Sequence, residues 1–311
     1  MSHSQGVAYQ GGHYLPISEA TIPLLDPAFI KSDVVFDAVS VWDSDFFRLD
    51  DHMARFRQSV EYVHMTLPFS DDAMKRIAAQ CVHRTGLSAA LVYMLCLRGQ
   101  YPAGAPFGDL RLCEQEFVAC AIPYYSCVPE DCAQTGAHLW IAQTRRAPNA
   151  AINQRCKNFN RMDLTRAQFE ALDAGADQPV LLSVDGLLTE GPGFNVWIVR
   201  DNTALTPGDN LLEGITRLTV FDLCQQIGFA ADAAQLRPEE LQHAEEAFLS
   251  SSAGGIYPVT TVNGRRIGNG TPGRVTCQLR DLYWKKRAGG WHATPVDDLL
   301  QIPTELPSQH C

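Results

Sequence analysis

Hydrophobic residues follow two different periods in the first part of the chain. Runs rich in β-branched and aromatic residues are typical of strands, and apolar residues three or four positions apart are typical of helices. We expect residues 1–20 to form a poorly ordered arm with a strand start near 14–17. The pattern then predicts strands over 34–42, 46–49, 90–97 and 117–124, a helix capped by Asp50 or Asp51, and a helix over 71–85.

The helix after Asp51 carries Met53, Phe56, Val60 and Val63 at the spacing of one buried face, which places Arg55 near the edge of the sheet. In the second part of the chain, short apolar runs again alternate with helical patterns. The pattern predicts strands over 137–142, 179–184, 194–200, 247–251 and 264–267, and helices over 162–175, 215–227, 237–245 and 273–286. The helix over 215–227 is expected to bury Leu218, Phe221 and Cys224.

Two loops divide this pattern. Residues 99–108 form a long loop rich in glycine and proline, and residues 126–134 have the composition of a linker between domains. Strands and helices alternate on both sides of that linker. The sequence therefore predicts an α/β (α+β) fold with an N-terminal domain over 1–125, the linker over 126–134 and a C-terminal domain over 135–311, with the functional site in the cleft between the domains.

Composition and charge exclude several classes of protein. The chain has 311 residues, of which 46% are hydrophobic, and a formal net charge of -10. This charge argues against a nucleic-acid partner. We find no uncharged apolar run of the ~18 residues that a membrane-spanning helix needs, and the polar start has no signal-peptide pattern. We therefore expect a cytoplasmic protein.

The ten cysteines do not have the spacing of a metal site. No two of them are separated by only two residues, and several lie inside apolar runs, as Cys96 does in the predicted strand over 90–97. We expect reduced thiols that pack as small hydrophobic side chains, and no metal.

The strongest candidate chemistry lies in Lys157 and in Glu190, which is followed by two glycines around a proline. A lysine amine can form a Schiff base with an aldehyde, and a buried carboxylate can keep a ring nitrogen protonated. These are the two groups that a pyridoxal phosphate enzyme must supply. The spacing alone favours a surface lysine and a glutamate at the end of a strand, because both residue types are common.

Several ordered motifs resemble the fold type IV pyridoxal phosphate enzymes. These enzymes are the branched-chain and D-amino acid aminotransferases, the aminodeoxychorismate lyases and the (R)-selective amine transaminases. Lys157-Asn158, Asp163-Leu164 and Thr189-Glu190-Gly191 carry the resemblance, which extends from about Phe36 to about Tyr283. It is strongest toward the (R)-selective amine transaminases, through the segments 36–43, 46–52, 214–217 and 251–256. The resemblance implies the two-domain fold type IV architecture, with the cofactor in the interdomain cleft.

The resemblance also implies roles for particular residues. Lys157 would be the catalytic Schiff-base lysine, and Glu190 would pair with the pyridine nitrogen. The amides of Ile215 and Thr216, at the start of a helix, would bind the phosphate. The other residues that would surround the cofactor are Arg55, Phe194, Asn195, Leu212, Gly214, Ser251 and Ser252.

Substrate residues follow from the same resemblance. The (R)-selective enzymes tend to have His, Tyr and Glu where this chain has Lys31, Phe36 and Tyr93. An arginine of the mobile loop often binds the carboxylate of the keto acid in relatives, and Arg111 is the nearest arginine here. The predicted substrate residues are Lys31, Phe36, Ala38, Leu91, Tyr93, Arg111 and Ala253.

The predicted function is that of a homodimeric transaminase that moves an amino group between an (R)-amine or D-amino acid and a 2-oxo acid such as pyruvate. The alternatives within the family are a branched-chain L-amino acid aminotransferase and an enzyme resembling aminodeoxychorismate lyase. An alternative from another class is a silent small-molecule binding protein. That alternative would need neither Lys157 nor Glu190.

Overall fold

A computed structural model describes residues 5–106 and 108–301. Phe107, in the predicted loop, lies outside the described residues. So do residues 1–4 of the predicted N-terminal domain and residues 302–311 of the predicted C-terminal domain. The chain forms two compact units. The first unit comprises the described residues of 1–124, 156–160 and 290–311, and the second unit comprises 125–155 and 161–289. The second unit begins at Tyr125, one residue before the predicted linker, and the lysine segment 156–160 and the described residues from Gly290 onwards group with the first unit.

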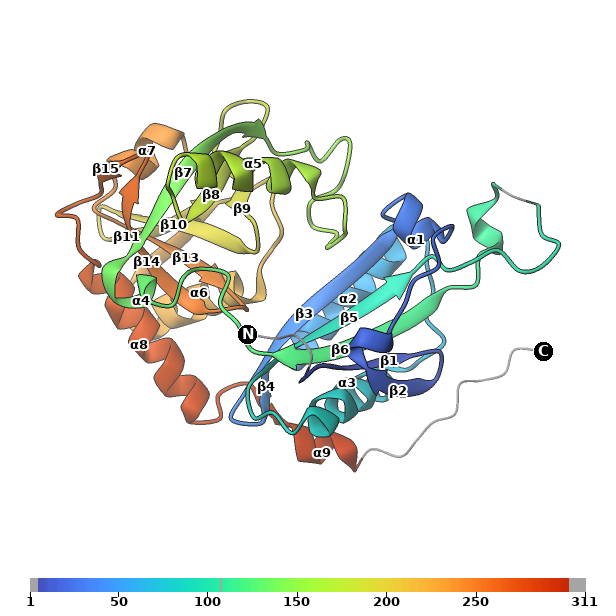
Figure 1. The fold of residues 1–311 in the computed structure, drawn as a ribbon. Coiled ribbons are helices and arrows are strands. Elements are labelled where there is room, and N and C mark those ends of the chain that lie inside the picture. Colours follow the sequence, from blue (N-terminus) through green and yellow to red (C-terminus); the bar gives the residue numbers. More distant parts are fainter. Residues whose placement is uncertain (1–4, 107, 302–311) are drawn as a thin grey trace. The chain divides into compact units, whose positions relative to one another are not determined.

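The first unit is built on a seven-stranded sheet with the strand order β16-β4-β3-β5-β6-β1-β2 (Figure 1). Helices α2 and α3 pack on this sheet. The elements are β1 (Val7–Gln10), β2 (His13–Pro16), α1 (Pro27–Ile30), β3 (Val34–Trp42), β4 (Asp45–Phe47), α2 (Leu49–Tyr62), α3 (Asp71–Thr85), β5 (Ala90–Leu97), β6 (Glu116–Pro123), β16 (Ala293–Pro295) and α9 (Val296–Leu300), with 3-10 turns at Ile17–Glu19 and Leu110–Leu112.

The two faces of this sheet have different roles. Successive residues of a strand point to opposite faces, so Val35 and Val39 of β3 join Val92 and Met94 of β5 in the core under α2 and α3. The alternate residues lie on the opposite face, which we call the open face. The register pairs Ala38 with Tyr93 there.

Two local predictions for the first unit are wrong. The N-terminal segment is ordered from Val7 onwards, because β1 forms a hairpin with β2 and pairs with β6. Helix α2 begins after Arg48, which has a left-handed backbone (φ 53) and makes no side-chain cap. Asp50 and Asp51 are not caps. They lie in the first turn, where the positive end of the helix dipole stabilises their negative charges.

The second unit contains a nine-stranded sheet with the main order β12-β11-β10-β13-β14-β7-β8, in which β15 pairs with β14 and β9 with β10. Its elements are α4 (Cys132–Thr135), β7 (Ala137–Arg145), α5 (Met162–Asp173), β8 (Gln178–Leu182), β9 (Glu190–Gly191), β10 (Phe194–Arg200), β11 (Thr203–Pro207), α6 (Ile215–Gln226), β12 (Ala230–Ala234), α7 (Pro238–Gln242), β13 (Glu246–Ser251), β14 (Gly255–Val262), β15 (Arg265–Arg266) and α8 (Arg274–Ala288).

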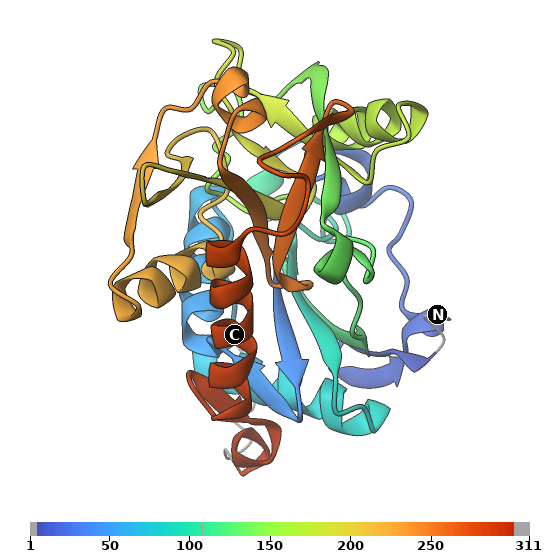
Figure 2. The same cartoon turned by 90° about the vertical axis from the view of Figure 1, so that its left-hand side faces the viewer.

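Helices α6 and α8 contact each other and strand β13 (Figure 2). Trp197 of β10 stacks on Phe248 of β13 at 5.5 Å between ring centroids, and Phe221 of α6 meets the same tryptophan edge-on at 5.0 Å. The predicted buried face of α6 is partly wrong, because Leu218 is 43% exposed whereas Val220 is buried. The buried side of the helix also includes Thr216, Thr219, Leu223 and Cys224.

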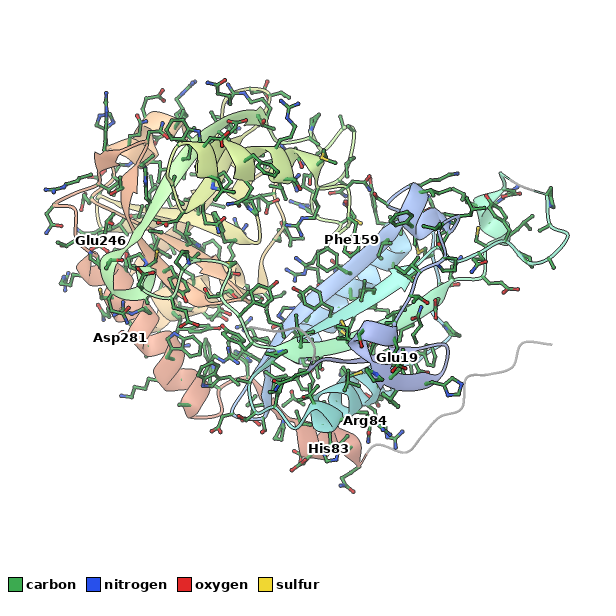
Figure 3. All side chains as sticks on the ribbon, in the orientation of Figure 1. Glu19, His83, Arg84, Phe159, Glu246 and Asp281 are labelled. Carbon is green, nitrogen blue, oxygen red and sulfur yellow. The ribbon has the colours of Figure 1, made fainter. Side chains whose placement is uncertain are left out.

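The start of α8 is held by a carboxylate. Glu246, labelled in Figure 3, accepts hydrogen bonds from the amides of Val275 and Thr276 at 3.0 and 2.8 Å. These amides have no acceptor within the helix, so the glutamate replaces a capping side chain. Gly273 at the N-cap lets this carboxylate approach closely, because a Cβ there would lie 2.0 Å from the Glu246 Cδ and would displace the side chain.

The described residues contain no helix that is long and apolar enough to cross a membrane. They also contain no cluster of three potential metal ligands. Nine cysteines within the described part of the chain are free thiols, and six of them are buried (Cys81, Cys96, Cys113, Cys132, Cys156 and Cys224). This agrees with the prediction that the cysteines pack as small hydrophobic side chains.

Candidate active site

The segment that carries Lys157 extends the sheet of the first unit. Asn158 forms an antiparallel bridge with Val35 of β3. The amide of Phe36 donates to the Lys157 carbonyl at 2.9 Å, and the Lys157 amide donates to the Ser59 hydroxyl of α2 at 3.1 Å. The main chain of the lysine is therefore held by β3 and by α2, which explains why this segment groups with the first unit and not with the predicted C-terminal domain.

The side chain of Lys157 lies on the open face. Residues opposite each other in an antiparallel pair point to the same side, so Asn158 points with Val35 toward α2, and its neighbours point the other way. The Lys157 Nζ accordingly lies 4.7 Å from the centroid of the Phe36 ring. The Phe36 ring also contacts Phe159 at 4.9 Å and stacks on Tyr93 at 6.3 Å.

The structure thus places four of the predicted substrate residues, Phe36, Ala38, Leu91 and Tyr93, on one face with Lys157. Phe159 was missed. Its position two residues after the lysine, in a segment that pairs as a strand, is the signal that could have found it.

The three other predicted substrate residues lie elsewhere. Lys31 is exposed and ends α1. The Arg111 side chain is 88% exposed and donates to both carboxylate oxygens of Asp109, at 2.8 and 2.6 Å. Ala253 belongs to the second unit, where its amide donates to the Ser251 hydroxyl at 3.1 Å. Roles for these residues stay predictions.

Arg55 of α2 is paired with a buried carboxylate. Its Nε and Nη2 each donate to Asp37 of β3 at 2.8 Å, and Nδ1 of His52 lies 2.7 Å from the same carboxylate. Burial alone raises the pKa of Asp37, but the charges of Arg55 and His52 outweigh it and hold this pKa well below its usual range. Burial lowers the pKa of His52, and the positive charges of Arg55 and Lys157 lower it further, against the opposing effect of Asp37.

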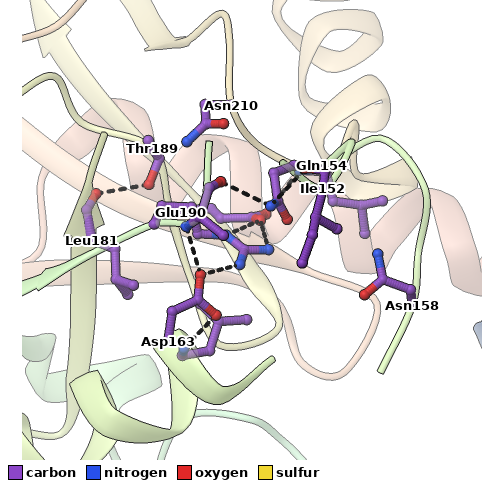
Figure 4. A network of polar contacts seen from close by, with 12 residues as sticks. Ile152, Gln154, Asn158, Asp163, Leu181, Thr189, Glu190 and Asn210 are labelled. Atoms are coloured by element: carbon purple, nitrogen blue, oxygen red, sulfur yellow. Dashed lines mark hydrogen bonds and ion pairs between the residues drawn. The ribbon is translucent and has the colours of Figure 1, made fainter. Parts of the chain in front are cut away.

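Glu190 is the centre of a polar network in the second unit (Figure 4). It is buried, with 5% of its surface exposed. Its Oε1 accepts from Nε and Nη2 of Arg146 at 3.2 and 3.1 Å, and its Oε2 accepts from the Leu212 amide at 3.0 Å. Arg146 also donates from Nη1 to Asp163 at 2.6 Å. Arg146 was not among the predicted site residues. Its only signal in the sequence is weak: it is a basic residue at the end of an apolar strand.

A second set of contacts connects Glu190 to the start of α6. Asn195 is the register partner of Glu190, and its Nδ2 donates to the Leu212 carbonyl at 2.9 Å. The Asn195 Oδ1 would lie 2.2 Å from a Cβ on Gly214, so glycine at this N-cap position leaves room for the Asn195 side chain. Asn195 therefore supports the turn that leads into α6.

The first turn of α6 presents amides that have no acceptor within the helix. Gly214 makes no side-chain cap for them, and Ile215 and Thr216 are both buried. A helix start of this kind binds anions. The Ser251 hydroxyl donates to the Gly193 carbonyl at 2.7 Å, in the turn between β9 and β10, and Ser252 is the next residue.

The remaining predicted cofactor residue, Phe194, is buried at the start of β10. A Cβ on Gly191 would lie 2.1 Å from the Phe194 ring, so the glycine accommodates that ring. The donor set of the second unit fits a phosphorylated pyridine, because it offers a fixed carboxylate for a ring nitrogen and a helix start for a phosphate. That these residues touch the cofactor, and that the cofactor lies between the domains, stay predictions.

Comparisons with known proteins agree with this chemistry. The family model "Amino-transferase class IV" matches residues 34–262. The chain is 27% identical to a branched-chain-amino-acid aminotransferase of Pseudomonas aeruginosa, over 93% of this chain and 95% of the relative. It is 28% identical to a D-alanine aminotransferase of Bacillus licheniformis, over 85% of this chain and 91% of the relative.

Solved structures show the same fold. A branched-chain amino acid aminotransferase from Thermobaculum terrenum, solved in its pyridoxal phosphate form, has a TM-score of 0.83 and 25% identity, with 95% of this chain and 99% of that chain covered. The predicted nearness to the (R)-selective amine transaminases is not confirmed by these relatives and stays a prediction. The family match over residues 34–262 is decisive for the class: the chain belongs to the class IV aminotransferases, which use pyridoxal 5'-phosphate.

Proposed function

We propose that this aminotransferase moves an amino group between an (R)-amine or D-amino acid and a 2-oxo acid such as pyruvate. Its class already implies an amino donor and a 2-oxo acid acceptor. The choice of donor is the proposal, and the observation that carries it is the composition of the open face around Lys157.

Mainly apolar and aromatic side chains make up this face: Phe36, Ser40 and Leu91 are buried, Ala38 and Tyr93 are half-buried, and Leu95 and Val118 pack against the cluster that contains Ala28 of α1. The strand register places on it, beside Lys157, uncharged side chains from three strands: Phe36, Ala38 and Ser40 of β3, Leu91, Tyr93 and Leu95 of β5, and Val118, Cys120 and Ile122 of β6. None of these described strand positions carries a cation that would hold the carboxylate of an amino acid donor. Arg111, the predicted carboxylate ligand, already pairs with Asp109. An uncharged substituent beside the reacting carbon therefore suits this face, so within the proposal this observation favours the (R)-amine over the D-amino acid.

When bound, the cofactor takes up the amino group and accepts the electron pair that proton removal leaves on the donor carbon. Lys157 would bind the cofactor aldehyde through Nζ, yield it to the donor amine, and then move a proton to or from the donor carbon. Because the Nζ is held over the Phe36 ring, it would reach the donor carbon from one side only. Selection between mirror-image donors follows from this placement.

Other residues would hold the cofactor. Glu190, oriented by Arg146 and the Leu212 amide, would keep a proton at the ring nitrogen. Leu212 would pack on the ring. The phosphate would be bound by the Ile215 and Thr216 amides at the start of α6, with Arg55, Gly214, Ser251 and Ser252 as the further predicted contacts.

A second candidate is a branched-chain L-amino acid aminotransferase. Two observations favour it: the relatives from Pseudomonas aeruginosa and Thermobaculum terrenum carry the branched-chain activity in their names, and an apolar face also suits a branched aliphatic side chain. The D-alanine aminotransferase of Bacillus licheniformis is a relative of similar identity that points to the opposite hand. The choice between these candidates is a choice of donor configuration.

We also propose that the enzyme is a cytoplasmic homodimer. Five large apolar side chains lie exposed within one short segment of the first unit (Ile22, Leu24, Leu25, Phe29 and Ile30), with Leu24 and Leu25 at 75% and 79%. Exposed apolar patches of this kind mark association surfaces. Light scattering should give twice the chain mass, and Leu24→Asp/Leu25→Asp should give the monomer mass. A monomeric parent protein would exclude the dimer.

Donor selection tests the proposed function. The purified enzyme is incubated with pyruvate and either enantiomer of 1-phenylethylamine, and then with D- or L-alanine, D- or L-valine and D- or L-leucine paired with 2-oxoglutarate. We expect the (R)-amine or the D-amino acids to be consumed and their mirror images to be left. A donor larger by one methylene should differ by about 1–3 kcal/mol in transition-state binding, so the size preference is graded. Faster consumption of L-leucine or L-valine would establish the second candidate instead.

A further inference from the structure

Asp37 is the most completely surrounded charged group of the first unit. Its side chain is fully buried, with 0% exposed. Both carboxylate oxygens accept from Arg55, and Oδ1 also accepts from the Ala38 amide at 2.8 Å. His52 adds a contact through Nδ1 at 2.7 Å. An ionised carboxylate only accepts hydrogen bonds, so the His52 Nδ1 must carry the proton that is donated.

The geometry of the pair fixes the direction of the arginine. Two parallel bonds from Nε and Nη2 hold the plane of the guanidinium relative to the carboxylate, which a single bond would not do. His52 and the Ala38 amide in turn fix the carboxylate. A buried ion pair adds little net stability compared with apolar side chains of the same volume. Orientation of Arg55 is therefore a better explanation for this cluster than stability of the fold.

The cluster lies next to the lysine segment. Asp37 follows Phe36, whose amide binds the Lys157 carbonyl. The positive charge of Lys157 acts on His52 from within the same unit. Ser59, one helical turn after Arg55 on α2, binds the Lys157 amide. Strand β3 and helix α2 therefore bind the main chain of the lysine segment and also provide the residues of the cluster that contains Arg55.

We propose that Asp37 and His52 are positioning residues that hold the Arg55 guanidinium in the orientation in which it binds the cofactor phosphate. This inference rests on the proposed role of Arg55. Asp37 receives two of the guanidinium's hydrogen bonds and sets its plane, and His52 keeps Asp37 in place through Nδ1. Neither residue touches the cofactor in this arrangement. Their effect on cofactor binding must pass through Arg55.

The experiment compares two ligands that differ only in the phosphate. Apoprotein of the full chain is titrated with pyridoxal 5'-phosphate and with pyridoxal, and binding is followed by absorbance and by the shift in melting temperature. The variants are Asp37→Asn, Arg55→Leu and the double variant. The matched control is Asp33→Asn, because Asp33 forms the same paired contact with Nε and Nη2 of Arg98 in the same unit, at 2.8 and 3.2 Å.

We expect Asp37→Asn to raise the dissociation constant of pyridoxal 5'-phosphate by about tenfold or more and to leave that of pyridoxal unchanged. In the Arg55→Leu background the same substitution should have no further effect on either ligand, since residues that act through one contact are not additive. Asp33→Asn should not change the ratio of the two constants. His52→Gln should shift this ratio in the same direction as Asp37→Asn, by less.

The experiment distinguishes failure of the positioning role from failure of the proposed contact between Arg55 and the phosphate. If Arg55→Leu weakens only the phosphorylated ligand but Asp37→Asn does not, the positioning role is overturned and the placement of Arg55 stands. If Asp37→Asn weakens both ligands equally, the residue is merely structural and the inference fails. If Arg55→Leu does not discriminate between the ligands, the proposed phosphate contact itself is wrong. If Asp37→Asn alone does not fold, His52→Gln decides, because it keeps both Asp37 and Arg55: an unchanged ratio of the two dissociation constants in that variant overturns the positioning role.

Discussion

Arg146 is expected to stabilise the second unit more than any ordinary ion pair would, because it serves two carboxylates. Its guanidinium donates two bonds to Glu190 and one to Asp163. In Arg146→Leu, Asp163 keeps hydrogen bonds from the Ala147 and Leu164 amides. Glu190 loses both bonds to its Oε1 and keeps, of the contacts described above, only the bond from the Leu212 amide to its Oε2. The variant therefore leaves a buried negative charge without its counter-charge.

Breaking a buried pair costs about 3–5 kcal/mol. We expect the low end of this range, about 3 kcal/mol, because Asp163 keeps its amides. That loss is a large part of the ~5–15 kcal/mol that stabilises a typical domain. Urea unfolding of the apoprotein, followed by tryptophan fluorescence and circular dichroism, measures it. The double variant Arg146→Leu/Glu190→Gln should recover part of the loss, because the uncompensated charge is gone.

The control is an exposed pair in the same unit. Arg200 pairs with Glu240, and its side chain is 45% exposed. Arg200→Leu should cost no more than about 1 kcal/mol. If Arg146→Leu lowers the free energy of unfolding by as little as this control does, Arg146 does not compensate the buried charge of Glu190. The proposal that Arg146 orients Glu190 would then be refuted.

Three further outcomes are expected. Arg55→Ala should release the cofactor on dialysis far more readily than Ser252→Ala, because a charged donor contributes about 1.5–3 kcal/mol; equal retention in both variants would contradict the placement. The pKa of Asp37 is lower in the folded than in the unfolded protein, so its stabilising effect is complete above the unfolded value of about 4 and is lost as the pH falls. The stability deficit of Asp37→Asn in urea should accordingly shrink from pH 7 to pH 3, and a constant deficit would argue against the ion pair. Burial raises the pKa of Cys156 to about 11, so iodoacetamide at pH 8 should label this thiol only after unfolding, and rapid labelling of the native protein, detected by mass spectrometry, would show that the thiol is accessible.

The elements with strong local signals could be predicted from the sequence. Helix Asp71–Thr85 and strand Ala90–Leu97 have the predicted bounds. The helix is delimited by Ser70, whose hydroxyl accepts from the Ala73 amide, and by Gly86, whose left-handed backbone (φ 69) ends it. Where the cap, the period and the stop agree, local chemistry alone sets the element.

Elements that depend on distant partners were not predicted. Strand β12 (Ala230–Ala234) has little hydrophobic pattern and forms because it pairs in parallel with β11. Strand β14 (Gly255–Val262) contains Pro258, and proline locally disfavours a strand, yet β14 pairs with β13 on one side and with β7 on the other. The predicted strand over 264–267 is only the short β15. Tertiary pairing overrides local preference in each case.

The candidate site shows the same division. The resemblance identified Lys157 and Glu190 because their neighbouring residues form motifs. The partners that orient these groups lie far away in the sequence. Arg146 is 44 residues from Glu190, and Ser59 is 98 residues from Lys157. No local pattern connects residues at such separations, so only the fold reveals which side chains support the site.

The attachment point of the cofactor shows whether Lys157 is the Schiff-base lysine. The chain has five lysines, Lys31, Lys75, Lys157, Lys285 and Lys286. The purified enzyme, loaded with pyridoxal 5'-phosphate, is reduced with borohydride to make the lysine–cofactor bond permanent and is then digested for peptide mass spectrometry. Our account predicts the cofactor mass on Lys157, with cleavage by trypsin blocked there, and no labelled peptide from Lys157→Ala. A label on another lysine of the parent enzyme, or transamination by the purified Lys157→Ala variant, would contradict it.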